Sequence, residues 1–553
     1  MSTDSSCGNL THASDVYSNA QIAAFKQEGL WKDRLLVDYL IGHAASQGSR
    51  TAVVAGDRRI TFAELADSVD RIAAGLMRMD LPSDSFVAVQ LPNVVEFVQV
   101  YLAIQRAGLR AVTLMPIYRE QDVTFMLGKC AAKVFVIPDT YRGFDFVEMA
   151  RTVRAGLPTL DKIVVVGEPA PPDLVSFDDL LASQVLGEDA YTDARPDPDG
   201  LSKVSFTSGT TGKPKGVVHT HNTDLVIPVL LAEAAGMTAD TPLWMPSPVS
   251  HVTGLILGLY PAMVAGAKFV LQDRWDPAAG LELIAREKAV LTVSATPFIA
   301  AMLDVPNRDD YDISSFKYFI SGGARVSPRM VERARDELDI ALLRVFGGAE
   351  APLHAMNPTN ADWSVLTGRD GKTFPQLHSR IVDPDNRSRE LPRGELGEYA
   401  TSGAHVFLGY LDDPERTREA RDDEGWFYSN DLCTIDGAGY VLYVDRIKDI
   451  VNRGGVKISA MEVENELLTH PSVREVAVVA VPDHELGERA YAFVVTHGDK
   501  PITLDDLRRH LKARGVTTQK WPEFLQSVDS LPMTVTGKVL KGELRKALTT
   551  TTV

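Results

Sequence analysis

Residues 205–216, SFTSGTTGKPKG, concentrate hydroxyl groups, glycines and cations in one short stretch of the chain. Glycines allow the backbone to turn so that several N–H groups converge on one anion; here they are Gly209, Gly212 and Gly216. Side-chain hydroxyl and ammonium groups add further donors; they belong to Thr207, Ser208, Thr210, Thr211, Lys213 and Lys215. This set of donors suits a polyphosphate, although a plain surface loop of Ser, Thr and Gly has the same composition.

The stretch differs from the phosphate-binding loop of P-loop nucleotide hydrolases. Pro214 follows Gly212 and Lys213, whereas a Walker A loop requires Ser or Thr after its Gly-Lys pair. The residues alone therefore leave two hypotheses open, a phosphate-binding loop of another kind and a surface loop.

The elements around this stretch predict a layered α/β fold. Apolar segments at 86–93, 133–139, 162–168 and 203–209 have the composition of buried strands, and 95–108 has the spacing of a helix that ends at a glycine. Strands that alternate with amphipathic helices indicate largely parallel sheets whose strands are covered on both faces.

The rest of the chain differs in pattern, and the difference suggests a domain organisation. Short apolar segments separated by Gly, Asp and Pro predict a β-rich subdomain at 376–445, within a large N-terminal domain at 31–445. The pattern of strand-like and helical segments over residues 446–553 predicts a small, mobile α+β domain, with Ser459 as the N-cap of its first helix. We expect residues 1–30 to form a poorly ordered segment.

Composition restricts the function. The chain has 553 residues and a formal net charge of −17, which argues against an overall basic surface for nucleic acid. Its three cysteines, Cys7, Cys130 and Cys433, are far apart, so neither a disulfide framework nor a zinc site is indicated. The polar N-terminus has no secretory signal, and no run of about 18 apolar residues appears. We therefore expect a cytoplasmic protein without stable membrane insertion.

Six segments, in order along the chain, resemble the motifs of the adenylate-forming (ANL) enzymes, and in particular the acyl-CoA synthetase branch. The segments are SFTSGTTGKPKGVVHTH from 205, ISGGARVSP from 320, VFGGAEAP from 345, GWFYSNDL from 425, DRIKDIVNRGGVKISAMEVE from 445 and LPMTVTGKVLKGELR from 531. The resemblance extends from about residue 35 to 545, and the family also includes peptide-synthetase adenylation domains and luciferases.

The resemblance implies a two-step reaction. A carboxylic acid is activated with MgATP as an acyl adenylate, with release of pyrophosphate, and a thiol such as that of coenzyme A then displaces AMP. Both steps develop negative charge on oxygen atoms, so catalysis is expected to depend on positioning and electrostatic stabilisation.

The resemblance also implies a role for each matching residue. Glu350 is expected to bind Mg²⁺, Thr211 to act in the phosphate loop, and Lys538 to contact the α-phosphate and the attacking carboxylate. Other expected ATP or AMP contacts, besides the 207–215 loop, are Gly322, Gly323, Ala324, Phe346, Gly347, Asp431 and Arg446. The hinge is placed at Lys448, and the coenzyme A passage at Gly454 and Gly455.

Simpler structural roles remain open for several of these residues. The alternative for Asp431 is a turn residue, since Asn-Asp pairs favour turns. The alternative for Glu350 is a carboxylate at the start of a helix. The alternative for Gly454 and Gly455 is a plain flexible turn. Lys538 has the alternative of a solvated surface lysine. His251 is either a buried core histidine or the residue that gates the acyl pocket.

The sequence also departs from the family pattern. Ala349 replaces the usual Thr or Ser before the Mg²⁺ glutamate, Asn430 replaces a Gly, and Ala460 replaces a Pro. A lost neutral hydrogen bond changes stability or binding by about 0.5–1.5 kcal/mol, so these changes weaken the case for activity without removing a charged residue. An inactive nucleotide-binding homologue is therefore the remote alternative.

The pocket residues implied by the resemblance are mostly apolar. They are His251, Val252, Gly254, Leu255, Phe298, Gly348 and Ala349, together with Phe346. The segment 295–303 offers no acid for a substrate ammonium group, and Val252 stands where dihydroxybenzoate activators commonly have Asn. We therefore expect a hydrophobic acid, which is medium-chain, alicyclic, polycyclic or aryl.

The acceptor and the assembly are less defined. No carrier-protein segment follows the lysine motif, so the expected acceptor is free coenzyme A, with a separate carrier protein as the alternative. The expected partners are thus a small acid and coenzyme A, and either a monomer or a homodimer is compatible with the sequence.

Overall fold

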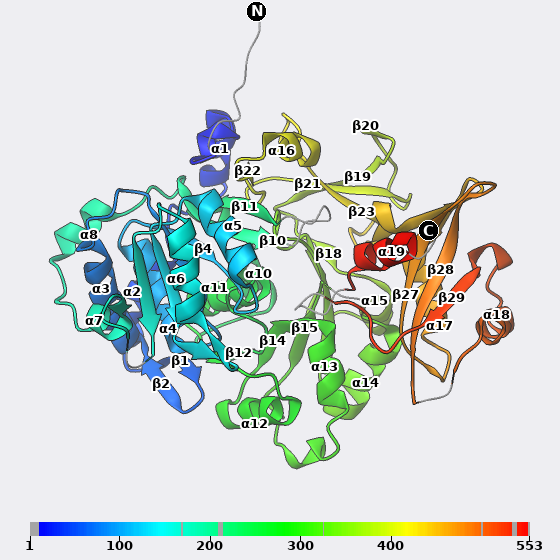
Figure 1. The fold of residues 1–553 in the computed structure, drawn as a ribbon, viewed down its shortest axis with the longest axis horizontal. Coiled ribbons are helices and arrows are strands. Elements are labelled where there is room, and N and C mark those ends of the chain that lie inside the picture. Colours follow the sequence, from blue (N-terminus) through cyan, green and yellow to red (C-terminus); the bar gives the residue numbers. More distant parts are fainter. Residues whose placement is uncertain are drawn as a thin grey trace, which may run out of the picture. The chain divides into compact units, whose positions relative to one another are not determined.

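A computed structural model describes six stretches of the chain (Figure 1): residues 10–167, 170–207, 214–323, 326–498, 501–533 and 539–550. The chain divides into two compact units. The first unit comprises Met1–His378 and Thr401–Phe427, and the second comprises Ser379–Ala400 and Tyr428–Val553.

The first unit contains two sheets in which most neighbouring strands run parallel. The sheet that carries the predicted phosphate loop has the order β22-β11-β10-β4-β3-β5-β8-β9. Its strands are β22 (Gly409–Tyr410), β11 (Lys215–Thr220), β10 (Leu201–Thr207), β4 (Arg110–Thr113), β3 (Phe86–Val89), β5 (Val134–Pro138), β8 (Lys162–Val166) and β9 (Val175–Ser176).

The other sheet of the first unit has the order β18-β17-β16-β15-β14-β12-β13-β1-β2. Its strands are β18 (Lys372–Thr373), β17 (Ala355–Met356), β16 (Ala341–Phe346), β15 (Tyr318–Ser321), β14 (Leu291–Ser294), β12 (Leu243–Met245), β13 (Phe269–Leu271), β1 (Thr51–Ala55) and β2 (Arg58–Thr61). A short hairpin pairs β6 (Thr140–Tyr141) with β7 (Phe144–Asp145).

Helices connect these strands along the chain. They are α1 (Asn19–Gln27), α2 (Leu36–Gln47), α3 (Phe62–Met77), α4 (Val95–Arg106), α5 (Glu120–Cys130), α6 (Phe146–Gly156), α7 (Phe177–Leu181), α8 (Glu188–Ala194), α9 (His221–Ala234), α10 (Val252–Gly254), α11 (Tyr260–Ala265), α12 (Pro277–Glu287), α13 (Thr296–Leu303), α14 (Pro328–Leu338), α15 (Trp363–Gly368) and α16 (Pro414–Ala420). Short helical turns occur at η1 (Ala13–Asp15), η2 (Leu255–Leu259) and η3 (Arg308–Asp310).

The predicted layered α/β fold is confirmed. The apolar segments 86–93, 133–139 and 162–168 contain β3, β5 and β8, and the segment 203–209 overlaps β10, which begins two residues earlier. All residues of β5 are buried, which explains why its sequence VFVIP lacks the alternation of a strand with one exposed face.

The N-terminal prediction is wrong from Leu10 onward. Instead of a poorly ordered segment, these residues form η1 and α1, and Tyr17 and Trp31 are buried. The rings of Tyr17, Phe25 and Trp31 contact one another, with centroids 5.1–5.6 Å apart. Three aromatic side chains that pack together stabilise a segment whose overall polarity suggested disorder.

The second unit contains the two remaining larger sheets. One has the order β20-β19-β21-β23-β24 and the other β26-β25-β28-β27, with β29 parallel to β28. The strands are β19 (His378–Asp383), β20 (Asn386–Glu390), β21 (Gly397–Ser402), β23 (Phe427–Ile435), β24 (Val441–Arg446), β25 (Ile450–Arg453), β26 (Val456–Ser459), β27 (Val473–Asp483), β28 (Gly487–Thr496) and β29 (Phe524–Ser527). The helical elements are η4 (Ile447–Asp449), α17 (Ala460–Leu467), α18 (Leu504–Ala513), η5 (Thr518–Lys520) and α19 (Lys541–Thr550).

The compact units divide the chain differently from the expected boundary near residue 446. Asp445, at the end of β24, accepts hydrogen bonds from the Ser459 hydroxyl at 2.8 Å and the Met461 N–H at 2.9 Å. These bonds attach β24 to the start of α17, so the β-rich sheet and the C-terminal segment belong to one unit. Ser459 is the N-cap of α17, as predicted, and accepts a hydrogen bond from the Glu462 N–H.

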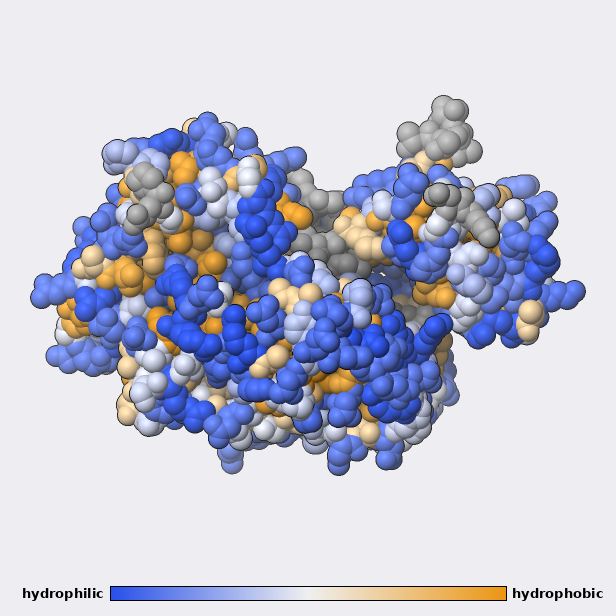
Figure 2. Space-filling model, turned by 90° about the horizontal axis from the view of Figure 1, so that it is seen from below, coloured by the Kyte–Doolittle hydropathy of each residue, from blue (hydrophilic) through white to orange (hydrophobic). Residues whose placement is uncertain are grey.

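The face of the molecule seen in Figure 2 has the mixed character of an ordinary globular protein. On the face seen in Figure 2, hydrophilic residues predominate and apolar residues are scattered among them. No helix in the described ranges is long and apolar enough to cross a membrane. Cys130 and Cys433 are both buried, and burial raises the pKa of the Cys130 thiol.

Candidate active site

The two ends of the predicted phosphate loop lie side by side. Thr207, the last residue of β10, is the cross-strand partner of Lys215, the first residue of β11. The hairpin therefore closes the base of the stretch 208–213. That stretch lies outside the described residues, so the roles expected for Ser208, Gly209, Thr210, Thr211, Gly212 and Lys213 remain predictions.

Tyr410 joins the expected phosphate lysine to the expected Mg²⁺ ligand. Its hydroxyl donates a hydrogen bond of 2.7 Å to Glu350 Oε1. The Lys215 ammonium nitrogen lies 4.7 Å from the centroid of the Tyr410 ring, within the range of a cation–π contact. Burial, followed by the adjacent Glu350 carboxylate, raises the pKa of Tyr410, so its hydroxyl remains a donor near neutral pH. The sequence analysis missed this tyrosine.

The turn that carries Glu350 is held by hydrogen bonds to its backbone carbonyls from two sides. The Phe407 N–H donates to the Glu350 carbonyl at 2.8 Å. On the other side, His219 Nε2 lies 2.9 Å from the Ala349 carbonyl oxygen. Gly347 is required in this turn, because an added Cβ would approach the Pro352 carbonyl oxygen to 2.4 Å.

The protonation state of His219 follows from its partners. A carbonyl oxygen only accepts, so Nε2 carries the proton and Nδ1 accepts from the Thr223 hydroxyl at 3.1 Å. Burial, followed by the charge of Lys203, lowers the pKa of His219 to about 4. The ring is therefore neutral near pH 7 and holds a single tautomer. Lys203 itself forms a buried ion pair with Asp224 at 2.6 Å.

Expected site residues follow several parallel strands of the sheet that contains β12, β14, β15 and β16, and they lie at the same edge of that sheet. His251 and Val252 follow β12, Phe298 follows β14, and Gly322 and Gly323 follow β15. Phe346 is the last residue of β16, and Gly347 to Glu350 follow it. Carboxyl ends of parallel strands share one edge, and the chain order reverses between β12 and β14, which is where ligands bind in open α/β sheets.

A small pocket in the first unit collects residues from both of its sheets. It is lined by Thr113, Met115, Tyr118, Ser205, Phe206, Thr207, Ser250, His251, Val252 and Ala349. The structure thus brings His251, Val252 and Ala349 together with Thr207. His251 caps the short helix α10 and is not part of the buried core, which favours a position at the pocket.

Other expected pocket residues lie elsewhere. Phe298 packs edge-on against Trp275, with ring centroids 4.6 Å apart. Leu255 is fully buried in the core, and Gly254 lies against the Pro248 backbone. Gly348 is also not among the lining residues described. The acyl-pocket role expected for Gly254, Leu255, Phe298 and Gly348 remains a prediction.

The pocket also contains polar residues that the sequence analysis missed. Thr113 and Ser250 are only 4% and 5% exposed, and their hydroxyl oxygens have no hydrogen-bond partner among the described residues. Buried hydroxyls are normally paired, so these two are available to a ligand or to water. Thr113 was detectable in principle, since it ends β4 at the same edge as Thr207.

The predicted ribose residues lie together in the second unit. Asp431 on β23 and Arg446 on β24 are cross-strand partners, and Arg446 Nε lies 3.1 Å from Asp431 Oδ1. Asp431 lies inside a strand, so the alternative of a turn residue is wrong. Asn430, just before it, has a φ of 59°, the region that favours the Gly usual in this motif.

The predicted hinge and coenzyme A passage contain a regular hairpin. Gly454 and Gly455, with φ of 59° and 84°, form the two-residue connection between β25 and β26. Two positive φ angles are what a type I′ turn requires, so the turn alone accounts for both glycines. Lys448 lies in η4. Lys538 and Ala324 lie outside the described ranges, and the roles of all five residues remain predictions.

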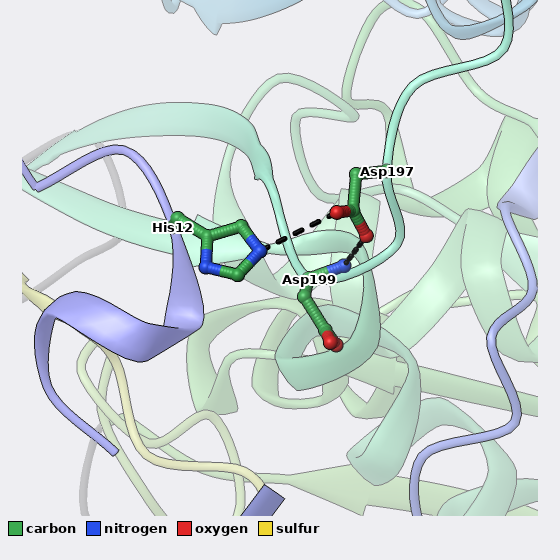
Figure 3. A group of neighbouring side chains, drawn as sticks. All are labelled: His12, Asp197 and Asp199. Carbon is green, nitrogen blue, oxygen red and sulfur yellow. Dashed lines mark hydrogen bonds and ion pairs between the residues drawn. The ribbon is translucent and has the colours of Figure 1, made fainter. Parts of the chain in front are cut away.

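His12, Asp197 and Asp199 form another group of possible metal ligands among the described residues (Figure 3). His12 is 3.4 Å from an Asp197 carboxylate oxygen, and Asp197 also accepts a hydrogen bond from the Asp199 N–H. The Asp199 carboxylate already accepts from Lys26 at 2.8 Å and Asn222 at 2.7 Å. These contacts attach the N-terminal segment to the residues that precede β10.

Comparison with known proteins identifies the family. The sequence matches the AMP-binding enzyme family over residues 42–411 and the AMP-binding enzyme C-terminal domain over 462–538. It is 34% identical to the medium-chain fatty-acid–CoA ligase of Escherichia coli, covering 96% of this chain and 93% of that protein. It is 31% identical to the 2,3-dihydroxybenzoate-AMP ligase of Bacillus subtilis, covering 95% of each.

Solved structures agree with this assignment. ATP-bound MatB of Rhodopseudomonas palustris is similar with a TM-score of 0.81 and 27% identity, over 93% of this chain and 99% of that one. The anthranilate CoA ligase AuaEII, in complex with anthranoyl-AMP, has the same fold, with a TM-score of 0.84 and 22% identity over 94% and 98%. The chain belongs to the AMP-binding enzyme family of the adenylate-forming superfamily and is an adenylate-forming ligase.

Proposed function

We propose that the protein converts a hydrophobic carboxylic acid, ATP and coenzyme A into an acyl-CoA, AMP and pyrophosphate. The observation that carries the proposal is the convergence of Lys215 and Glu350 on Tyr410, next to Thr207 at the end of β10. A cation and a carboxylate so placed suit the phosphates of ATP and its metal ion.

The first step joins the acid to AMP. A carboxylate oxygen attacks the α-phosphorus, the bond to the bridging oxygen of the β-phosphate breaks, and pyrophosphate leaves. Lys215 and the loop 208–213 would bind the β- and γ-phosphates, and Lys538 would stabilise the charge between the attacking carboxylate and the α-phosphate. Asp431 would accept hydrogen bonds from the ribose hydroxyls, with Arg446 beside it.

The residues present fit a magnesium ion. Mg²⁺ is usually bound by one or two carboxylates together with substrate phosphates, and Glu350 offers a half-buried carboxylate in a fixed turn. When bound, the ion would neutralise phosphate charge. Ala349 supplies no hydroxyl, but its carbonyl is bound by His219, so the turn keeps its position without the usual Thr or Ser.

The second step transfers the acyl group. The coenzyme A sulfur attacks the acyl carbon, the bond to the AMP oxygen breaks, and AMP leaves. Gly454 and Gly455 form the proposed passage for the pantetheine arm, and Lys448 is the proposed hinge. The similarity to the medium-chain fatty-acid–CoA ligase supports coenzyme A as the acceptor.

A carrier protein is the second candidate acceptor. Relatives include the 2,3-dihydroxybenzoate-AMP ligase, which is named for the adenylation step alone. The class of acid is likewise part of the proposal. The pocket combines apolar Met115, Phe206 and Val252 with the hydroxyls of Thr113 and Ser250, so its lining does not select one class of acid.

The test is pyrophosphate release over a panel of medium-chain, alicyclic, polycyclic and aryl acids, each with and without coenzyme A. Multiple turnovers that require coenzyme A would support the ligase. Acid-dependent pyrophosphate exchange that ignores coenzyme A would favour a carrier protein. No release with any acid, together with ATP binding by calorimetry, would favour the inactive homologue.

A further inference from the structure

We propose that Tyr410 is a positioning residue that orients the Glu350 carboxylate for Mg²⁺ and the Lys215 ammonium group for the ATP phosphates. The inference rests on the proposed function, because it takes Glu350 and Lys215 as the ligands of the metal–nucleotide complex. It adds a residue that belongs to none of the six motifs recognised in the sequence.

The position of Tyr410 is fixed by its backbone. Tyr410 lies on the short strand β22 and is the cross-strand partner of Val217. Val217 stands two residues after Lys215 on β11. The neighbouring Leu411 N–H donates to the Gly216 carbonyl at 2.8 Å, and the Tyr410 N–H donates to the Thr417 hydroxyl at 2.9 Å. The ring is therefore attached to the strand that leads out of the phosphate loop.

The ring itself has little freedom. Tyr410 is only 4% exposed and packs edge-on against Phe407, with ring centroids 5.0 Å apart. Phe407 in turn donates its N–H to the Glu350 carbonyl. One packed pair of aromatic residues thus holds Glu350 through both its backbone and its side chain.

The hydrogen bond orients the Glu350 carboxylate and leaves acceptor positions on it for a metal ion. The Tyr410 hydroxyl occupies one acceptor position on Glu350 Oε1, whereas an ionised carboxylate has about four such positions on its two oxygens. Carboxylates that bind metals are commonly hydrogen-bonded in this way, and loss of the outer partner typically lowers metal affinity about 10- to 100-fold.

The face of the Tyr410 ring contacts the Lys215 ammonium group. Lys215 extends over it with its nitrogen 4.7 Å from the centroid. A lysine side chain is flexible, so this contact restricts where its charge lies before ATP arrives. The hydroxyl and the ring face therefore have separable roles, one toward the metal and one toward the phosphates.

The test separates these roles by measuring ATP binding calorimetrically, with Mg²⁺ and with EDTA. Tyr410→Phe removes the hydroxyl and keeps the ring. We expect its ATP affinity to fall roughly 10- to 100-fold with Mg²⁺ and by less than about 2-fold in EDTA. Tyr410→Leu removes the ring as well and should weaken binding under both conditions.

Tyr17→Phe is the matched control. It removes a buried tyrosine hydroxyl that donates to the Val406 carbonyl at 2.7 Å, next to Phe407, but does not touch Glu350 or Lys215. We expect it to leave ATP affinity unchanged under both conditions. If it reduced Mg²⁺-dependent binding as much as Tyr410→Phe, the effect would be general destabilisation and the inference would be wrong.

A double-mutant comparison tests whether Tyr410 acts through Glu350. In a Glu350→Gln background, Tyr410→Phe should cause little further loss of Mg²⁺-dependent ATP binding. An equal loss in both backgrounds, or an equal loss with Mg²⁺ and EDTA, would overturn the inference. These binding measurements need no turnover, so they remain decisive even if the acid panel shows no pyrophosphate release.

Discussion

The imidazole of His219 donates a hydrogen bond of 2.9 Å to the carbonyl oxygen of Ala349, so strand β11 holds the turn that carries Glu350. The bond uses the backbone of Ala349 and is therefore independent of the hydroxyl that the resemblance implies for this position. It also makes a buried histidine part of the support of the proposed metal ligand.

Replacing His219 should destabilise the first unit and weaken Mg²⁺-dependent ATP binding. His219→Leu keeps a side chain of similar size but leaves the Ala349 carbonyl without this donor, which should lower the free energy of unfolding by about 1–3 kcal/mol. Urea unfolding measures the stability and calorimetry the ATP affinity. His484→Ala is the control, because its side chain is 86% exposed. Unchanged stability in His219→Leu would contradict the assigned role.

Stability should fall as the pH falls from about 6.5 toward 4. Burial lowers the pKa of His219 and His221 to about 4 and that of His354 to about 3, from the usual 6.5. Below about pH 6.5 the unfolded chain binds protons that the folded protein excludes, so unfolding becomes more favourable. Each histidine contributes roughly 1.4 kcal/mol per pH unit within this window. Urea unfolding at several pH values checks the slope.

One variant isolates a single contribution to that slope. His354→Phe removes one excluded proton, so its unfolding free energy should depend less on pH, by roughly 1.4 kcal/mol per unit between about pH 6 and 4.5. His484→Ala removes an exposed histidine and should leave the slope unchanged. Parallel curves for His354→Phe and the unsubstituted protein would show that His354 is not the buried neutral group assigned here.

Lys538→Ala should affect the two chemical steps unequally. By its place in the C-terminal lysine motif, Lys538 is proposed to stabilise charge in the adenylation step, and its loss should slow acid-dependent pyrophosphate exchange roughly 10²- to 10³-fold. Thioester formation from a supplied acyl adenylate and coenzyme A should be much less affected. Lys512→Ala, at an exposed position of α18, is the control. Equal loss in both steps would rule out the proposed role.

Asp431→Asn should weaken nucleotide binding. Loss of a charged acceptor for the ribose hydroxyls typically costs about 1.5–3 kcal/mol, so AMP affinity measured by calorimetry should fall at least about 10-fold. Asp436→Asn is matched in chemistry and lies in the turn between β23 and β24, where its side chain accepts from the Tyr440 N–H. If both variants bound AMP equally well, Asp431 would have only a structural role.

The sequence by itself determined the main elements of the fold. Buried strands such as β5 and β8 are recognisable because each is a short, mostly apolar run, and the N-cap of α17 depends only on Ser459 and its near neighbours. Local patterns of this kind are encoded within a few residues. The six motifs, read in order, likewise sufficed for the family, which the comparisons then showed.

Only the tertiary structure decided which residues meet. Tyr410 and Glu350 are 60 positions apart, and His219 and Ala349 are 130 apart, so no local pattern reports either hydrogen bond. The same is true of Thr113, which reaches the pocket only because parallel strands of the sheet align their carboxyl ends. The order of the N-terminal segment follows the same distinction, because its polar composition is local, whereas the packing of Trp31 against distant residues is not.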